Sequence, residues 1–301
     1  MSSDWESTFS SWTNPPSDTE EQKCVNVERM VKEAIYAYPI LSQKNIQIFA
    51  QGSYKNNTNI RLDSDVDICV RLMDVFFFDL PEGRDQSEFG IIPSSYPFSE
   101  YKDSVEIALI SKFGKESIKR GNKAVKVAPS SYRLGADVVA CFEHRRYSGN
   151  RNWTGDFQYL SGTEFRTDKG ERIVNWPIQH YENGVAKNRD TGRRFKHIVR
   201  ILKKLNLTME EDGVRICQRI TSFLIECLVW NVPNGILTGY SSYTDTVKNA
   251  LYHLYHHTEN EQLCDEWGEV SELLYLFRGR KWTKKDVNTF TIAAWNYLGF
   301  G

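Results

Sequence analysis

The chain has 301 residues, of which 40% are hydrophobic and 13% aromatic, so it suits one large domain or two closely associated lobes with a sizeable core. Its 38 lysines and arginines nearly balance its 39 aspartates and glutamates, and the net charge of −1 gives no support for bulk nucleic-acid binding. No apolar run is long enough to span a membrane and residues 1–4 are polar, so we expect no signal peptide, no membrane partner and a cytoplasmic location.

Residues 1–17 are polar and contain two prolines, so we expect an irregular arm. Three large aromatic residues are expected to pin this arm to the body of the protein: Trp5, Phe9 and Trp12. Ser17 or Asp18 can cap an amphipathic helix that runs to about Tyr38, where Pro39 interrupts it. This long helix is a candidate backbone for two lobes.

The stretch from residue 46 to residue 68 carries the strongest chemical signal. Residues 46–50 are a short apolar run of strand formers that delivers the loop Gln51-Gly52-Ser53-Tyr54. A second strand then carries Ser64-Asp65-Val66-Asp67-Ile68. Side chains two residues apart on a strand share a face, so Asp65 and Asp67 project together while their apolar neighbours face a core.

This arrangement predicts a site for a metal and a triphosphate. Two adjacent carboxylates raise each other's pKa, and a divalent cation between them relieves the repulsion. Mg²⁺ takes oxygen ligands and usually shares them with substrate phosphates. Gly52 allows close approach of backbone to phosphate, and Ser53 adds a hydroxyl donor. The alternative is a solvated acidic strand.

A third carboxylate follows later. We expect an irregular insertion over 74–97, a helix over 101–115, and an antiparallel strand pair formed by 123–128 and 134–142. Asp137 lies within the apolar part of the last strand, where a lone carboxylate is costly unless it is paired or bound to metal. We therefore predict Asp137 as the third metal ligand, acting as general base or placing the metal, with a water-facing edge position as the alternative.

The second half of the chain is mainly helical. Residues 157–182 are expected to form short strands and turns, and 192–207 a helix with a basic stripe made of Lys196, Arg200, Lys203 and Lys204. This stripe is either a solvated face or a phosphate-binding face, for which Lys196 is the best candidate. Residues 214–230 are expected to form one apolar helix.

The cysteines and histidines give no metal-binding spacing. The six cysteines form no Cys-x-x-Cys pair and are expected to be reduced core residues of a cytosolic protein. His253, His256 and His257 have no carboxylate or cysteine at ligand spacing and are expected to lie on the surface or pack.

With these residues placed, the chain resembles nucleotidyltransferases of the polymerase-beta superfamily. More closely, it resembles the bacterial CD-NTases, relatives of cyclic GMP-AMP synthase that make signalling nucleotides in anti-phage defence. The resemblance covers roughly residues 20–300 and rests on the loop and carboxylates above together with Asn57-Thr-Asn-Ile60, Ala136-Asp-Val-Val139, Ile173-Val-Asn-Trp-Pro177, His180, Lys196, Val199-Arg200 and Ser222-Phe-Leu-Ile-Glu226.

The resemblance implies an α+β fold. A polymerase-beta-like core with a mixed or antiparallel sheet would be followed by a helical C-terminal lobe, with the active site in the cleft and the long first helix spanning both. The implied domains are an arm at 1–17, the catalytic core at 18–185 and the helical lobe at 186–301.

The resemblance also implies roles for single residues. Asp65, Asp67 and Asp137 would bind two Mg²⁺ ions, with Mn²⁺ as a substitute. The donor triphosphate would be held by residues of both lobes: Gly52, Ser53, Lys196 and Ser222. Gln51 is similar in place to a residue that contacts nucleotide.

The implied activity is synthesis of a cyclic di- or trinucleotide from ATP, GTP, UTP or CTP, with release of pyrophosphate. The enzyme is expected to be a monomer, with an activating protein and a downstream effector as partners. The near-neutral charge and the lack of a zinc-binding insertion argue against double-stranded DNA as activator. The alternatives are a nucleotidyltransferase that modifies RNA or protein, and a non-catalytic nucleotide sensor.

Overall fold

The computed structural model describes residues 4–15, 17–60 and 65–300, so Ser64 of the second acidic motif lies outside the described residues. The chain divides into two compact units. The sheet unit comprises the described residues of 17–54 and 62–177, and the helical unit those of 1–16, 55–61 and 178–301. The expected boundaries of arm, core and lobe stay a prediction.

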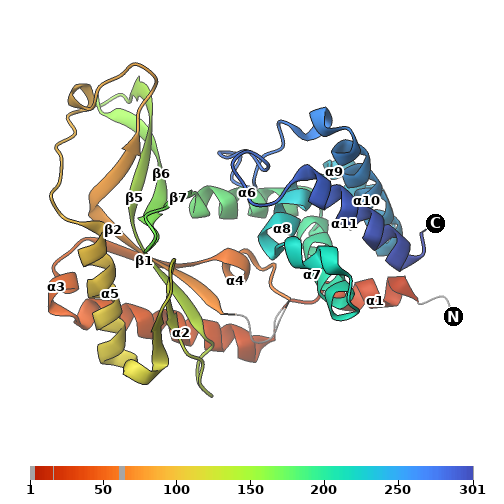
Figure 1. The fold of residues 1–301 in the computed structure, drawn as a ribbon, viewed down its shortest axis with the longest axis horizontal. Helices are drawn as coiled ribbons and strands as arrows, with labels where there is room; N and C mark the ends of the chain where they lie inside the picture. The colour runs from red at the N-terminus through yellow and green to blue at the C-terminus, as the bar shows by residue number, and fades with distance from the viewer. Residues whose placement is uncertain (1–3, 16, 61–64, 301) are drawn as a thin grey trace. The chain divides into compact units, whose positions relative to one another are not determined.

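The sheet unit is built on one mixed sheet of seven strands in the described chain (Figure 1). The order is β1-β2-β5-β4-β3, and β6 pairs with β5 and β7 with β6. Among the strands of the described residues, only β2 and β5 pair in parallel. The strands are β1 (Ile46–Gln51), β2 (Val66–Asp79), β3 (Ile118–Arg120), β4 (Val125–Val127), β5 (Ala136–Arg151), β6 (Phe157–Arg166) and β7 (Arg172–Asn175).

The expected antiparallel pair is confirmed, because β4 and β5 pair in that sense. The expectation of an irregular segment over 74–97 is wrong in its first part. After a register shift between Leu72 and Phe76, β2 continues beside β5 as far as Asp79. The long partner strand β5 supplies the hydrogen bonds that keep this polar and aromatic segment extended.

Two long helices cover one face of the sheet. The helices of this unit are α2 (Asp18–Ala37), α3 (Pro39–Ser42), α5 (Phe98–Phe113), and the 3₁₀ turns η1 (Gln86–Phe89) and η2 (Lys115–Ser117). The short helix α4 (Gly52–Asn56) begins in this unit, and its last two residues belong to the helical unit. The first long helix is confirmed, since the Ser17 side chain accepts a hydrogen bond from the Glu20 amide and caps α2. The apolar faces of α2 and α5 pack with Val66 and Ile68 of β2 in one core.

The helical unit has its own core. Its helices are α1 (Trp5–Trp12), α6 (Pro177–Asp190), α7 (Arg194–Glu211), α8 (Ser222–Trp230), α9 (Asn234–Thr238), α10 (Tyr243–Glu259), α11 (Lys284–Leu298), and the 3₁₀ turns η3 (Arg215–Arg219) and η4 (Glu261–Cys264). Across the described part of the chain, every helix is too short or too polar to cross a membrane.

Two expectations about this unit are wrong. The arm is not irregular, because residues 5–12 form α1, which begins where the Asp4 side chain accepts a hydrogen bond from the Ser7 amide. The single helix expected over 214–230 is broken into η3 and α8, and the Thr221 side chain caps α8. The pinning role of the arm aromatics is confirmed: Phe9 is wholly buried, and Trp5 and Trp12 pack against the same core.

Candidate active site

Four strands of the sheet carry polar side chains in one row. Gln51 on β1 is paired with Asp67 on β2, Asp67 with Asp137 on β5, and Asp137 with Lys126 on β4. Residues paired directly across neighbouring strands project from the same face of a sheet. The fold therefore brings together two carboxylates that are far apart in the sequence.

The alternation of each strand decides which face this row occupies. The apolar neighbours of Asp67 and Asp137 along their strands are wholly buried: Val66, Ile68, Ala136 and Val138. Because successive side chains of a strand point to opposite faces, both carboxylates project away from the core under α2 and α5. The predicted separation of apolar and acidic faces is confirmed for Asp67 and its neighbours Val66 and Ile68.

Asp65 lies directly before β2 and joins the row through Lys126. The Nζ atom of Lys126 lies 3.3 Å from Oδ1 of Asp137 and 3.6 Å from Oδ2 of Asp65. Both carboxylates raise the pKa of the lysine, Asp137 more strongly. The pKa of Asp67 is raised to about 6, first by burial and then by the charges of Asp137 and Asp65. The three carboxylates therefore form one electrostatic cluster.

Two glycines leave the space into which the carboxylates project. Gly52 has a φ of +69°, and a Cβ atom there would overlap Oδ2 of Asp67. A Cβ atom on Gly135 would overlap Oδ1 of Asp65. Asp65 lies beside Gly135 because the backbone amide of the next residue, Val66, donates to the Gly135 carbonyl over 2.8 Å. A larger residue at either position would have to displace a carboxylate.

The chemistry of this cluster fits a divalent cation. Oδ1 of Asp137 is buried and accepts no hydrogen bond from the described residues, and it forms an ion pair with the Lys126 ammonium. Hard cations such as Mg²⁺ bind such carboxylate oxygens. Within the described residues, however, no three His, Cys, Asp or Glu side chains already converge as a complete ligand set. The role of Asp65, Asp67 and Asp137 as metal ligands stays a prediction.

The segment after β1 is a short helix and not the expected loop. β1 ends at Gln51, and α4 begins at Gly52 and includes Ser53 in its first turn. The first backbone amides of a helix have no acceptor within the helix and suit an anion. Both Gln51 and Ser53 are half-buried, and their contacts with nucleotide and phosphate stay predictions.

The other two predicted triphosphate contacts belong to the helical unit. Lys196 lies in the first turn of α7, is half-buried, and has a pKa lowered mainly by burial. Ser222 is the exposed first residue of α8. Their roles in binding triphosphate stay predictions.

The prediction that α7 carries a continuous basic stripe on its surface, whether solvated or phosphate-binding, is wrong. Arg200 and Lys203 are each only 3% exposed. Arg200 donates to the carbonyl oxygen of Asn57 over 2.6 Å, and Lys203 donates to the carbonyl and hydroxyl oxygens of Thr58 over 3.1 and 3.0 Å. Both therefore fasten the described residues 55–60, the segment that follows Ser53 closely in the sequence.

Glu226 of α8 is the anionic centre of this buried network. Its Oε2 atom accepts hydrogen bonds from Lys203 over 3.0 Å and Thr58 over 2.8 Å. Its Oε1 atom lies 3.0 Å from Nε2 of His180 and accepts a hydrogen bond from the side-chain amide of Asn56 over 3.3 Å. His180 and Glu226, which the sequence marked only through the resemblance, thus have a structural role in this unit.

Sequence reasoning missed Lys126 and Gly135. For Lys126 a signal was present, because the expected antiparallel strands 123–128 and 134–142 place some residue opposite Asp137. For Gly135 no local signal exists, because the need for glycine depends on where Asp65 projects.

Comparison with known proteins identifies the family of this chain. Residues 182–299 match the family described as the cGAS/DncV-like nucleotidyltransferase C-terminal helical domain. The chain is 51% identical to a protein of Cecembia lonarensis named cyclic dipyrimidine nucleotide synthase CdnE, over 98% of both chains. It is 43% identical to a protein of the same name from Legionella pneumophila, over 99% of both.

A solved structure shares the fold. It is the CdnE cyclic dinucleotide synthase of Elizabethkingia meningoseptica with GTP and Apcpp, which is 36% identical with a TM-score of 0.80 over 98% of both chains. The predicted family, α+β fold and enzyme class are confirmed by these matches. The chain belongs to the cGAS/DncV-like nucleotidyltransferases and is a cyclic nucleotide synthase of the CdnE group.

Proposed function

We propose that this protein joins two pyrimidine nucleoside triphosphates into a cyclic dipyrimidine nucleotide and releases pyrophosphate at each linkage. The observation that supports the reaction is the cluster of Asp65, Asp67 and Asp137 on one face of the sheet, with glycines where the carboxylates need space. The choice of pyrimidines rests on relatives at 51% and 43% identity that are named for that product. The structure containing GTP and Apcpp is more distant, at 36%.

In this reaction a ribose hydroxyl oxygen attacks the α-phosphorus of a second nucleotide. The new P–O bond forms as the bond to the pyrophosphate oxygen breaks. Asp137 takes the proton of the attacking hydroxyl as general base. Ser53, Lys196 and Ser222 bind the donor triphosphate, and a second round in the same site closes the ring.

The carboxylate cluster also has the donor atoms that divalent cations need. Asp65, Asp67 and Asp137 would hold two cations, Mg²⁺ or in its place Mn²⁺, which when bound supply charge stabilisation at the phosphoryl and leaving-group oxygens. The chain itself keeps the three carboxylates on the face opposite the core, and Gly52 and Gly135 leave room for the oxygens of Asp67 and Asp65.

The test is incubation with all four ribonucleoside triphosphates and Mg²⁺, followed by phosphatase treatment and mass spectrometry. We expect a phosphatase-resistant cyclic dinucleotide that contains only uracil or cytosine, and none from the Asp67→Asn variant. A purine-containing product would contradict the choice of bases. Equal product formation by Asp67→Asn would contradict the site.

The cellular setting is part of the same proposal. We propose a monomeric cytoplasmic enzyme in anti-phage defence, switched on by an activating protein and read by an effector that binds the product. This rests on the family resemblance. Protection of bacteria against phage that is lost in Asp67→Asn would support it, and equal plaque counts with and without the gene's operon would contradict it.

A further inference from the structure

Lys126 is a charged group that no step of the proposed reaction uses. Its ammonium bridges Oδ1 of Asp137 and Oδ2 of Asp65, at 3.3 and 3.6 Å. Both carboxylates belong to the predicted cation site. Oδ1 of Asp137 is also the buried oxygen that accepts no hydrogen bond from the described residues. The lysine and a cation would therefore compete for the same oxygen atom.

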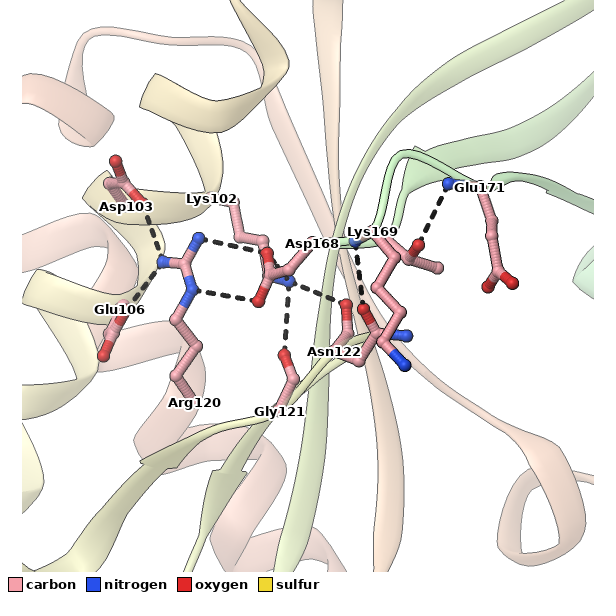
Figure 2. A network of polar contacts seen from close by, with 10 residues as sticks. Lys102, Asp103, Glu106, Arg120, Gly121, Asn122, Asp168, Lys169 and Glu171 are labelled. Atoms are coloured by element: carbon pink, nitrogen blue, oxygen red, sulfur yellow. Dashed lines mark hydrogen bonds and ion pairs between the residues drawn. The ribbon is translucent and has the colours of Figure 1, made fainter.

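The hairpin of β3 and β4, which carries Lys126, is held by a separate polar network around Lys102, Arg120 and Asp168 (Figure 2). Lys102 of α5, only 3% exposed, donates to two carbonyl oxygens of the turn 121–124 that joins β3 to β4, and to Asp168 over 2.8 Å. Arg120 at the end of β3 pairs with Asp168 and with two carboxylates of α5. The β3–β4 hairpin is thus tied to its neighbours on both sides, and Lys126 stays opposite Asp137.

The side chain of Lys126, in contrast, is free to leave. It is 53% exposed, and a lysine ammonium sits on a flexible four-carbon stem. A cation that binds a carboxylate oxygen at about 2.1 Å would place a double positive charge against the ammonium. The two cannot share this position, and the lysine can swing into solvent without any movement of β4.

We propose that Lys126 stands in for the divalent cation: it neutralises Asp65 and Asp137 in the cation-free enzyme and is displaced when the cation binds. This inference rests on the cation site of the proposed function. It predicts that the Lys126 ion pairs oppose cation binding while they stabilise the cation-free protein. The enzyme would thus keep its carboxylates in register before the nucleotide arrives with its metal.

The test is a titration of metal-stripped protein with Mn²⁺ alone at pH 8. Electron paramagnetic resonance measures the Mn²⁺ that remains free. Lys126→Met should bind Mn²⁺ more tightly than wild type, on the order of threefold to tenfold, because no ion pair has to be broken. In EDTA the same variant should melt at a lower temperature than wild type. Lys126→Arg keeps the charge and should behave like wild type in both measurements.

The matched control is Lys119→Met. Lys119 is exposed, pairs with Lys126 across β3 and β4, and lies one strand further from the carboxylates. Its loss should change neither Mn²⁺ affinity nor melting. Should Lys126→Met fail to fold, the comparison is made with Lys126→Gln.

Unchanged or weaker Mn²⁺ binding by the Lys126 variant would overturn the inference. If wild type shows no Mn²⁺ binding that depends on Asp67, both the cation site and the inference fail. Product formation measured on the same preparations keeps the two failures apart, since an active enzyme with unchanged affinities contradicts only the role of Lys126.

Discussion

Replacing Glu226 by glutamine tests whether a buried ion pair holds the segment around Asn56 and Thr58 in the helical unit. Glu226 and Lys203 have side-chain exposures of 5% and 2%, and their charged atoms lie 3.0 Å apart. The Glu226→Gln variant keeps the size of the side chain and leaves the lysine buried without its counter-charge. Breaking such a pair from one side typically costs about 3–5 kcal/mol.

The expected loss lies near the lower end of that range. Lys203 still donates to the carbonyl and hydroxyl oxygens of Thr58, and the glutamine oxygen can still accept one hydrogen bond. We therefore expect the free energy of unfolding of the helical unit to fall by about 3 kcal/mol at pH 7. The double variant with Lys203→Met should recover much of this loss, because no buried charge then remains.

The effect should depend on pH in a defined direction. Burial raises the pKa of Glu226, but the charges and hydrogen bonds of Lys203, His180 and Thr58 outweigh it and hold the pKa well below its usual value. A carboxyl group with a lowered folded-state pKa stabilises above its unfolded-state pKa, about 4.3, and loses that contribution as the pH falls further. The difference between wild type and Glu226→Gln should therefore shrink below about pH 4.

Urea unfolding followed by tryptophan fluorescence is the assay. Of the 8 tryptophans, those in the helical unit are the majority, namely Trp5, Trp12, Trp230, Trp267, Trp282 and Trp295. Glu266→Gln is the control, because Glu266 pairs with Arg278 at the surface, and its loss should cost less than about 1 kcal/mol. Equal losses in Glu226→Gln and Glu266→Gln would refute the reasoning.

Three further predictions concern the carboxylate cluster. Asp67→Asn should abolish product formation but raise the free energy of unfolding in EDTA at pH 8 by about 1–3 kcal/mol. The pKa of Asp67 is raised to about 6 in the folded protein, so ionisation of this carboxyl destabilises the fold as the pH rises from the unfolded-state pKa to 6. Equal melting temperatures of variant and wild type at pH 8 would contradict this. Gly135→Ala should lower product formation at least about tenfold by displacing Asp65, whereas Gly235→Ala, where a Cβ atom has open space, should not; equal rates would show that the cluster adjusts. Affinity for Mn²⁺ should fall below about pH 6 as Asp67 takes up a proton, and a flat affinity from pH 5 to 8 in the same titration would be inconsistent with that assignment.

The face on which each carboxylate lies could be predicted, because it follows from strand periodicity alone. Asp67 and Asp137 each stand between apolar residues, and a lone acidic residue there must face away from the core. The parallel pairing that sets them side by side could not be predicted from either strand. Nor could the continuation of β2 to Asp79, because those residues extend only where β5 pairs with them.

The buried cations show why the rest could not be predicted. Arg200 and Lys203 occupy helical positions that would carry the same sequence pattern on a solvated face. They are buried because Glu226 and residues 57 and 58 pack against them. Lys126 is the converse case. Its strand position indicates an exposed side chain, and the side chain is exposed, but the carboxylates with which it pairs come from Asp65, directly before β2, and from Asp137 of β5. In this chain, periodicity located the charged residues that interrupt an apolar strand. The ion pairs of a charged residue whose partner comes from a distant segment could be identified only from the structure. Removal of that partner is therefore the informative experiment for each of them, because a solvated cation would not respond to it.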